Sequence, residues 1–179
     1  MAKAKTTPAT SFPKSLKYDD DMEWWAGTAK LLGFAALRIA MGRRRSATKQ
    51  IHLFVPADED GPTDAQVVAY RYCLNNQPSV VKACLRGLTE VARKSRAAYE
   101  GMVPEQQLEK LLPKKVTAEQ LESRVRLASV QVTDREKQGV AYIEYDFNCA
   151  WDDEHGLLIV LHKDRLVYSG GSGDGWKDR

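Results

Sequence analysis

Residues 139–161, GVAYIEYDFNCAWDDEHGLLIVL, contain the two clearest strand patterns of the chain, separated by an acidic bend. From Ala141 to Cys149, aromatic and β-branched residues dominate every second position, and the positions between them include Glu144 and Asp146. This alternation is typical of a half-buried strand. Residues 157–161 are apolar on both faces, which predicts a strand in the middle of a sheet, covered on both sides. The stretch therefore predicts a hairpin within a larger sheet.

The bend between these strands holds the densest cluster of reactive side chains in the sequence. Asp152, Asp153, Glu154 and His155 place three carboxylates and one imidazole within four positions. Such groups bind zinc or iron, which makes Asp152, Glu154 and His155 candidate metal ligands. Glu154 with His155 is also a candidate acid–base pair for catalysis. Neighbouring side chains in a strand point to opposite faces, so at most two of these four side chains can converge on one site. His162 could complete such a site only if the following strand brought it back beside the bend.

A structural role for the same bend is the preferred interpretation. Cys149 and Trp151 continue the apolar parity of the first strand and would anchor the bend in the core. Asp152 or Asp153 would accept hydrogen bonds from free backbone N–H groups of the turn. Gly156 would supply a backbone conformation that other residues resist.

Length and composition fit one globular domain. The chain has 179 residues and a net charge of +3, which does not indicate nucleic-acid binding. Its three cysteines are Cys73, Cys84 and Cys149; their odd number and the absence of CxxC favour a reducing compartment. We find no apolar run of about 20 residues and no secretory signal. We therefore expect a cytoplasmic protein with no membrane association and no cofactor.

The ends of the chain are predicted to lie outside the folded part. Residues 1–15 are rich in Lys, Thr, Pro and Ala and predict a disordered lead. A single α+β domain is expected over residues 16–171, and residues 172–179 are expected to form a flexible tail pinned by Trp176. The glycine-rich run 170–175 is neither a P-loop nor a dinucleotide motif, because Trp176 follows it.

Residues 22–45 are the hardest to assign. Two strands separated by glycines are preferred, although residues 31–41 equally suit a short helix. Arg43 to Arg45 predict a solvated turn, and nucleic-acid binding through them ranks last among the functions considered. Residues 51–55 are a convincing strand, in which His52 is expected to be an ordinary strand histidine.

Two helices follow. Thr63 and Gln66 have the spacing of a capping box and predict a helix over residues 64–75. An i, i+3, i+4 apolar stripe predicts a second helix over residues 79–100, and the pair would form an αα-hairpin. Residues 101–116 are expected to be a mobile connection. Thr117 and Gln120 repeat the capping-box spacing and predict a single helical turn.

The remaining chain predicts strands. Residues 124–133 suggest a strand with a bulge, residues 134–139 a turn, and residues 157–162 and 166–169 a hairpin. The predicted fold is α+β, with an antiparallel sheet of roughly six strands and the αα-hairpin packed on one face.

Residues 139–171 resemble an uncharacterised family of bacterial domains. The resemblance rests on G-x-A-Y-I and on C-x-W-D-x-E-H-G-L, with a weaker match in P-T-D-A-Q-V-V-A-Y and an overall extent of about residues 48–171. Leu158 stands where a glycine is common in that family. The resemblance implies no assigned activity and, loosely, a likeness to immunity proteins of bacterial toxin systems. The positions matching its marker are Cys149, Trp151, Asp152, Glu154, His155 and Gly156.

Two functions remain open at this point. The first is a non-catalytic binding or interaction module, of the immunity-like kind that the resemblance implies, with another protein as partner and with Asp152, Asp153, Glu154 and His155 as binding residues. The second is a small metal-dependent hydrolase using Asp152, Glu154 and His155. Because we find no complete catalytic motif, we prefer the first. The oligomeric state is not predicted.

Overall fold

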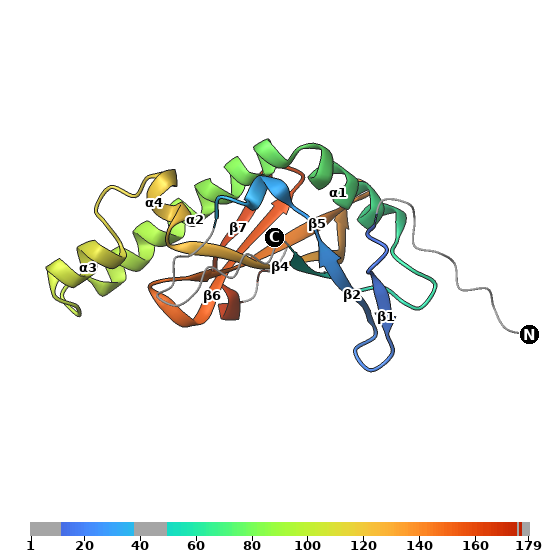
Figure 1. The fold of residues 1–179 in the computed structure, drawn as a ribbon, viewed down its shortest axis with the longest axis horizontal. Helices are drawn as coiled ribbons and strands as arrows, with labels where there is room; N and C mark the ends of the chain where they lie inside the picture. The colour runs from blue at the N-terminus through green and yellow to red at the C-terminus, as the bar shows by residue number, and fades with distance from the viewer. Residues whose placement is uncertain (1–11, 38–49, 175, 177–179) are drawn as a thin grey trace, which may run out of the picture.

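A seven-stranded, mostly antiparallel sheet forms the centre of the protein (Figure 1). The structure is a computed structural model that describes residues 12–37, 50–174 and 176. The strands stand side by side in chain order: β1 (Lys17–Asp19), β2 (Trp24–Ala29), β3 (Ile51–Val55), β4 (Val125–Lys137), β5 (Val140–Cys149), β6 (Asp152–His162) and β7 (Arg165–Gly171). The α+β prediction is confirmed. The short strand β1, which the sequence did not predict, raises the number above the expected six.

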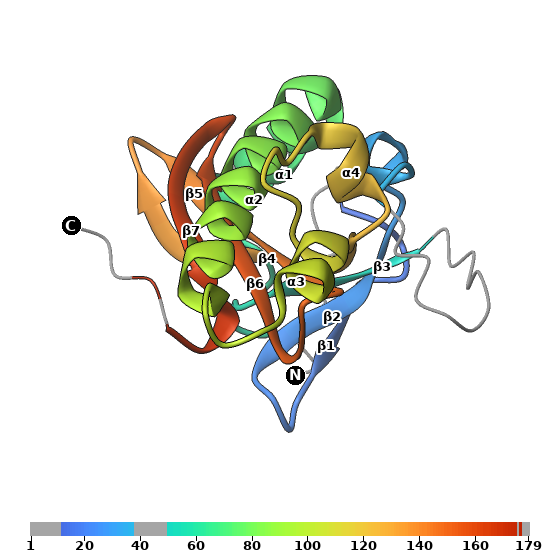
Figure 2. The same cartoon turned by 90° about the vertical axis from the view of Figure 1, so that its left-hand side faces the viewer.

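The four α-helices of the described chain lie in one crossover connection, between β3 and β4. Strands β3 and β4 are parallel neighbours, whereas every other neighbouring pair of the sheet is antiparallel. Parallel neighbours need a long connection, and this one contains α1 (Asp64–Asn75), α2 (Gln77–Tyr99), α3 (Glu105–Leu111) and α4 (Ala118–Glu122). Helix α1 lies over β4 and β5, and α2 lies over β6 and β7 (Figure 2). Both helices cover one face, and we call the opposite face of the sheet the open face.

Two capping boxes start helices as the sequence predicts. In α1, Thr63 Oγ1 accepts from the Gln66 N–H at 3.3 Å, and Gln66 Oε1 accepts from the Thr63 N–H at 2.8 Å. Thr117 and Gln120 form the same pair at the start of α4. The predicted bounds of α1 are correct, and α2 begins two residues earlier than predicted.

A single residue joins the two long helices. The Asn76 N–H and its Nδ2 both donate to the Tyr72 carbonyl, while the Asn76 carbonyl accepts from Val80 and Ser79. Asn76 therefore ends α1 and begins α2 at once. In Figure 1 the helices follow one another along the sheet with a bend between them, so each covers its own pair of strands. They pack on one face as predicted, but as an open bend instead of a closed hairpin.

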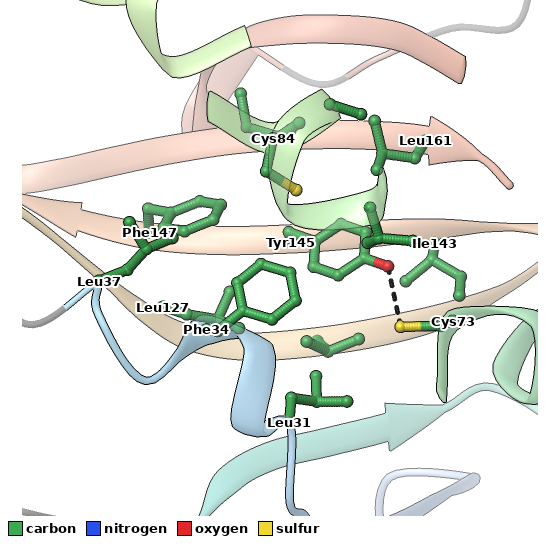
Figure 3. Close-up of a cluster of buried hydrophobic side chains, with 14 of the residues drawn as sticks. Leu31, Phe34, Leu37, Cys73, Cys84, Leu127, Ile143, Tyr145, Phe147 and Leu161 are labelled. Carbon is green, nitrogen blue, oxygen red and sulfur yellow. Dashed lines mark hydrogen bonds between the residues drawn. The ribbon is translucent and has the colours of Figure 1, made fainter. Parts of the chain in front are cut away.

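The main core lies between these helices and the sheet, and Tyr145 of β5 stands at its centre (Figure 3). Its ring is fully buried and stacks on Phe34 with centroids 5.5 Å apart. Its hydroxyl donates to Cys73 Sγ of α1 at 3.2 Å, and burial raises the pKa of this hydroxyl well above its usual value. Gly87 lies where α2 approaches the sheet, and a Cβ there would stand 2.8 Å from the terminal methyl group of Ile159.

Strand β6 is buried on both faces, as its apolar run predicts. Leu157, Ile159 and Leu161 belong to the main core under the helices. Leu158 and Val160 belong to a second cluster on the open face, formed with Tyr142 and Trp176. Helix η2 (Ser172–Asp174) leads the chain back across that face to Trp176, which is buried.

Three predicted segments differ from the structure. Strand β2 is present in residues 22–45. Where a second strand was predicted, residues 32–34 form the 3₁₀ helix η1, and residues 38–49, with Arg43 to Arg45, lie outside the described residues. The connection 101–116 contains helix α3. Strand β4 continues through residues 134–137, which were predicted as a turn; only Gln138 and Gly139 turn, both with positive φ. The bulge predicted in β4 is present.

A buried arginine explains the ordered connection. The guanidinium of Arg96 in α2 donates to Glu105 at 2.7 Å, contacts Glu109 at 3.2 Å and also donates to the Leu112 carbonyl. Leu108 and Leu112 of this connection are buried in the core. These tertiary contacts tie α3 to α2, and they have no local sequence signal.

Among the described residues, we find no helix that is both long enough and apolar enough to cross a membrane.

Candidate functional site

The acidic bend is the first candidate site, and its residues belong to a strand. Cys149 pairs with Asp152, so the tight turn consists of Ala150 and Trp151, and β6 begins at Asp152. The Ala150 N–H donates to the Arg124 carbonyl at 2.9 Å, which fixes this turn against the start of β4. The prediction that residues 152–155 form the turn is therefore wrong, because two residues suffice to reverse the chain.

Asp152 organises the start of β6 through one oxygen. Its Oδ1 accepts from the backbone N–H groups of Glu154 at 3.2 Å and of His155 at 3.1 Å, and it lies 3.1 Å from His155 Nδ1. Partial burial opposes the ionisation of Asp152, but these hydrogen bonds outweigh it and lower the pKa of the carboxyl. The structure thus places Asp152 as the acceptor of local N–H groups that the sequence predicts for Asp152 or Asp153.

The other candidate residues of the bend do not surround a common point. The side chains of Glu154 and His155 are exposed, His155 by 67%, and the side chain of Asp153 lies outside the described part of the structure. His162 lies seven residues farther along β6, about 23 Å away at the rise of a strand, and contacts the Lys137 carbonyl at 3.0 Å. Within the described side chains, no three His, Cys, Asp or Glu come together as metal ligands.

The apolar residues of the same motif lie in the core. Trp151 and Cys149 are both buried, and the Cys149 thiol contacts the Asp152 carbonyl at 3.4 Å. Gly156 has φ +67°, and a Cβ there would stand 2.9 Å from the Phe147 carbonyl oxygen. Gly156 therefore permits a conformation and a close approach that a larger residue resists. The binding role of Asp152, Asp153, Glu154 and His155 stays a prediction.

A second candidate site lies on the open face. Register places two rows of side chains across it: Ala26, Phe54, Gln131, Glu144, Val160 and Tyr168 in one, and Thr28, His52, Ser129, Asp146, Leu158 and Gly170 in the next. Trp24 precedes Ala26 by two residues and shares its face. The rings of Trp24 and Phe54 are 5.3 Å apart, and those of Phe54 and His52 are 6.3 Å apart. We call Trp24, Phe54 and His52 the aromatic strip.

Exposure distinguishes the two halves of this face. Over β5 and β6, Trp176 packs edge-on against Tyr142, and its Nε1–H donates to Glu144. The Arg135 guanidinium lies 5.0 Å above the Trp176 ring and donates to its carbonyl at 3.1 Å. Over β2 and β3, by contrast, the Trp24 and Phe54 rings are partly exposed and His52 is exposed. The aromatic strip is the half that can contact another molecule.

Two carboxyl groups are half-buried beside Trp176. Burial raises the pKa of Glu144 although the Trp176 N–H opposes this shift. Burial also raises the pKa of Asp146, whose two oxygens accept from Ser129 at 3.1 Å and from Ser172 at 3.4 Å. These carboxyl groups are occupied in holding the C-terminal segment against the open face.

The aromatic strip was not predicted, although the sequence contains a signal for it. Trp24 and Trp25 are adjacent in a strand, so their side chains must point to opposite faces. Trp25 is buried in the main core, and its neighbour Trp24 therefore reaches the open face. His52 and Phe54, two residues apart in β3, share that face.

Together these features define a domain of mixed sheet and helix with one helix-covered face and one open face. The chain belongs to a family described as a domain of unknown function (DUF6985), whose model matches residues 16–176. No curated protein and no solved structure matches the chain. The matched range contains the aromatic strip, the hairpin at residues 149–156 and Trp176.

Proposed function

We propose that this protein is a non-catalytic interaction module that binds another protein through its open face, with the aromatic strip at the centre of the contact. The proposal rests on one observation: the Trp24 and Phe54 rings, 5.3 Å apart, are partly exposed on a sheet face that α1 and α2 leave uncovered. Large aromatic side chains contribute most strongly to protein–protein affinity because they bury much area with few rotatable bonds.

The surroundings of the strip favour specific contact over simple apolar burial. Phe54 stands opposite Gln131, and His52 stands opposite Ser129. Amide and hydroxyl groups beside exposed rings can form the polar contacts that fix the orientation of a partner. The open face is thus a surface with apolar centres and polar neighbours.

The alternative hydrolase receives less support from the geometry. Asp152 already accepts two backbone N–H groups through Oδ1, and its other contact is a largely exposed imidazole. A metal-dependent hydrolase needs several side chains that converge on one ion, and the described side chains contain no such group of His, Cys, Asp or Glu. Surface grooves lie beside Phe12 and Tyr70 and along α3, and the residues of the acidic bend do not line them.

Affinity purification from the cell that encodes this chain tests the module. We compare the wild-type protein with a Trp24→Ala, Phe54→Ala variant and with a control, Leu32→Ala, Met102→Ala, whose residues are 71% and 79% exposed elsewhere. A partner retained by wild type and control but lost from the strip variant supports the proposal. Recovery of no partner by the wild-type protein, or equal retention by the strip variant, refutes it. Circular dichroism verifies that each variant is folded.

Two finer parts of the proposal concern biological context. A cytoplasmic location is favoured by Cys73, Cys84 and Cys149, which are buried free thiols. An immunity function, in which the protein protects the cell by binding a toxin, is the more specific version of this proposal, and it requires that the partner be a toxin. Cell fractionation tests the location, and co-expression with a toxin encoded beside this gene tests the protection; if the toxin kills equally with and without the protein, this form is excluded.

A further inference from the structure

The end of the sheet where the aromatic strip begins is strongly acidic. Asp19 ends β1, and the turn that follows it contains Asp20, Asp21 and Glu23. The loop after β3 contains Asp58, Glu59 and Asp60. Over residues 17–26 and 55–64, Lys17 is the single basic residue. The net charge of +3 therefore conceals a marked separation of charge along the molecule.

The structure brings these two acidic loops together. The Nε1–H of Trp25 donates to the Asp58 carbonyl at 2.9 Å, which fixes the second loop against β2. Tyr18 lies close enough to both loops for their carboxylates to affect its hydroxyl. The pKa of Tyr18 is raised first by desolvation and then by the negative charges of Glu23, Asp20, Glu59 and Asp58. None of the seven acidic side chains forms an ion pair with another residue in the described ranges.

The aromatic strip adjoins this acidic end directly. Asp19 of β1 pairs with Trp24 of β2, so the carboxylate and the indole are cross-strand neighbours on the open face. Asp19 Oδ1 accepts from the Asp21 and Met22 N–H groups at 3.1 and 3.2 Å, which holds the acidic turn beside the ring. Met22 is 54% exposed there. A surface of carboxylates and exposed rings is thus continuous from the turn to Phe54.

The geometry points to a lysine- and arginine-rich segment of a partner protein as the occupant of this surface. The inference rests on the interaction module proposed above and names the chemistry of its partner. A guanidinium can stack on the Trp24 or Phe54 ring as a cation–π contact and bind a carboxylate of the neighbouring turn at the same time. The uncompensated charge of the loops attracts such a segment at long range and speeds its association.

The same charge disfavours the other macromolecular occupants. Nucleic acid would bring phosphates beside seven carboxylates, although exposed rings on a sheet otherwise suit single strands. A second copy of this chain could offer the basic residues of α2, such as Lys82, Arg86 and Arg93, which are exposed. Dimerisation through contact between the aromatic strip of one copy and α2 of another is a distinct outcome, which light scattering measures.

The direct test uses a fluorescein-labelled nona-arginine peptide, with nona-glutamate and an oligothymidylate of similar length as comparison probes. In fluorescence anisotropy at low salt, the wild-type protein binds nona-arginine and neither comparison probe. A Trp24→Leu, Phe54→Leu variant keeps apolar volume but removes both ring faces, and it lowers the affinity by about threefold to tenfold. An acidic-loop variant, Asp20→Asn, Asp21→Asn, Glu23→Gln, changes three exposed carboxylates in the loop next to Trp24. It lowers the affinity by about tenfold and flattens the dependence on salt.

A charge-matched control removes three exposed carboxylates elsewhere: Glu119→Gln, Asp134→Asn and Glu136→Gln. It keeps the wild-type affinity within about twofold, because more distant charges are screened. Equal losses in control and loop variant, binding of oligothymidylate through the strip, or no binding of nona-arginine would overturn the inference. If the partner from affinity purification needs the strip but not the loop carboxylates, the module stands and the basic chemistry fails. If that partner does not need the strip, the module itself fails.

Discussion

Gln66 is the residue whose replacement tests the fold most sharply. Its side chain is fully buried at the start of α1. Nε2 donates to the Pro56 carbonyl at 2.7 Å, and it lies 3.2 and 3.3 Å from the carbonyls of Thr133 and Val132. Oε1 accepts the Thr63 N–H of the capping box. One amide therefore joins the end of β3, the bulged part of β4 and the first turn of the crossover helix.

The expected cost of Gln66→Leu follows from these contacts. The lost half of the capping box costs about 1 kcal/mol. Two amide hydrogens serve three carbonyls, so two buried acceptors lose their donors, at about 1 to 3 kcal/mol each. The added apolar surface of leucine returns about 1 kcal/mol. We expect the free energy of unfolding to fall by about 3 kcal/mol.

Gln120→Leu is the matched control, because Gln120 forms the same capping box in α4 without reaching a strand. It should cost about 0.5 to 1 kcal/mol. Urea unfolding followed by circular dichroism measures both, and equal m-values establish that the comparison concerns stability alone. If Gln66→Leu costs no more than Gln120→Leu, the amide does not hold the crossover to the sheet, and the reasoning fails.

Three further changes test other parts of the structure. Gly156→Ala should destabilise by about 2 kcal/mol because it adds a close backbone contact to a left-handed conformation, whereas Gly139→Ala, with positive φ in open space, should cost about 1 kcal/mol in the same urea assay. Arg96→Met should cost about 2 kcal/mol and increase hydrogen exchange across α3, while the exposed Arg93→Met should change neither; unchanged exchange in the first variant would contradict the role of the guanidinium. Burial raises the pKa of Glu144, so the stability that its protonated form contributes is complete below its ordinary pKa of about 4.3 and is lost as the pH rises through the raised value. The wild type should therefore gain stability relative to Glu144→Gln when the pH is lowered from about 7 to about 4.3, as measured by urea unfolding at both pH values. A stability difference that stays constant would show that burial does not perturb this carboxyl.

Local patterns in the sequence predicted the elements that neighbouring residues encode. The capping boxes at Thr63 and Thr117 identified two helix starts, because such a box is completed within four residues. The alternation before Cys149 and the apolar run after Gly156 identified β5 and β6. Each of these signals reports contacts formed between residues close in the chain.

Segments stabilised by distant residues were predicted poorly. Helix α3 depends on Arg96 and on buried Leu108 and Leu112, none of which signals a helix at residues 105–111 by spacing. The end of β4 and the turn after it were displaced because β4 continues through a bulge to pair with β5 as far as Lys137. Pairing with a partner strand, and not propensity, decided that boundary.

The candidate site shows the same division. The sequence drew attention to Asp152, Glu154 and His155 because reactive residues stand side by side there. Trp24, Phe54 and Asp19 come together only through the register of three paired strands. The order of these strands in the sheet cannot be predicted from the sequence of any one strand. An aromatic strip of this kind has no motif, because its members are neighbours across strands.

The sequence by itself determined the mixed fold class, the two capped helices, the hairpin at residues 139–161 and the burial of β6 on both faces. Only the tertiary structure decided which strands each long helix covers, and that the other face exposes aromatic rings beside the acidic turn that follows β1. The physical reason is that capping and periodicity are energies of nearby residues. The choice of face depends instead on the single parallel crossover between β3 and β4, which is a property of the whole sheet.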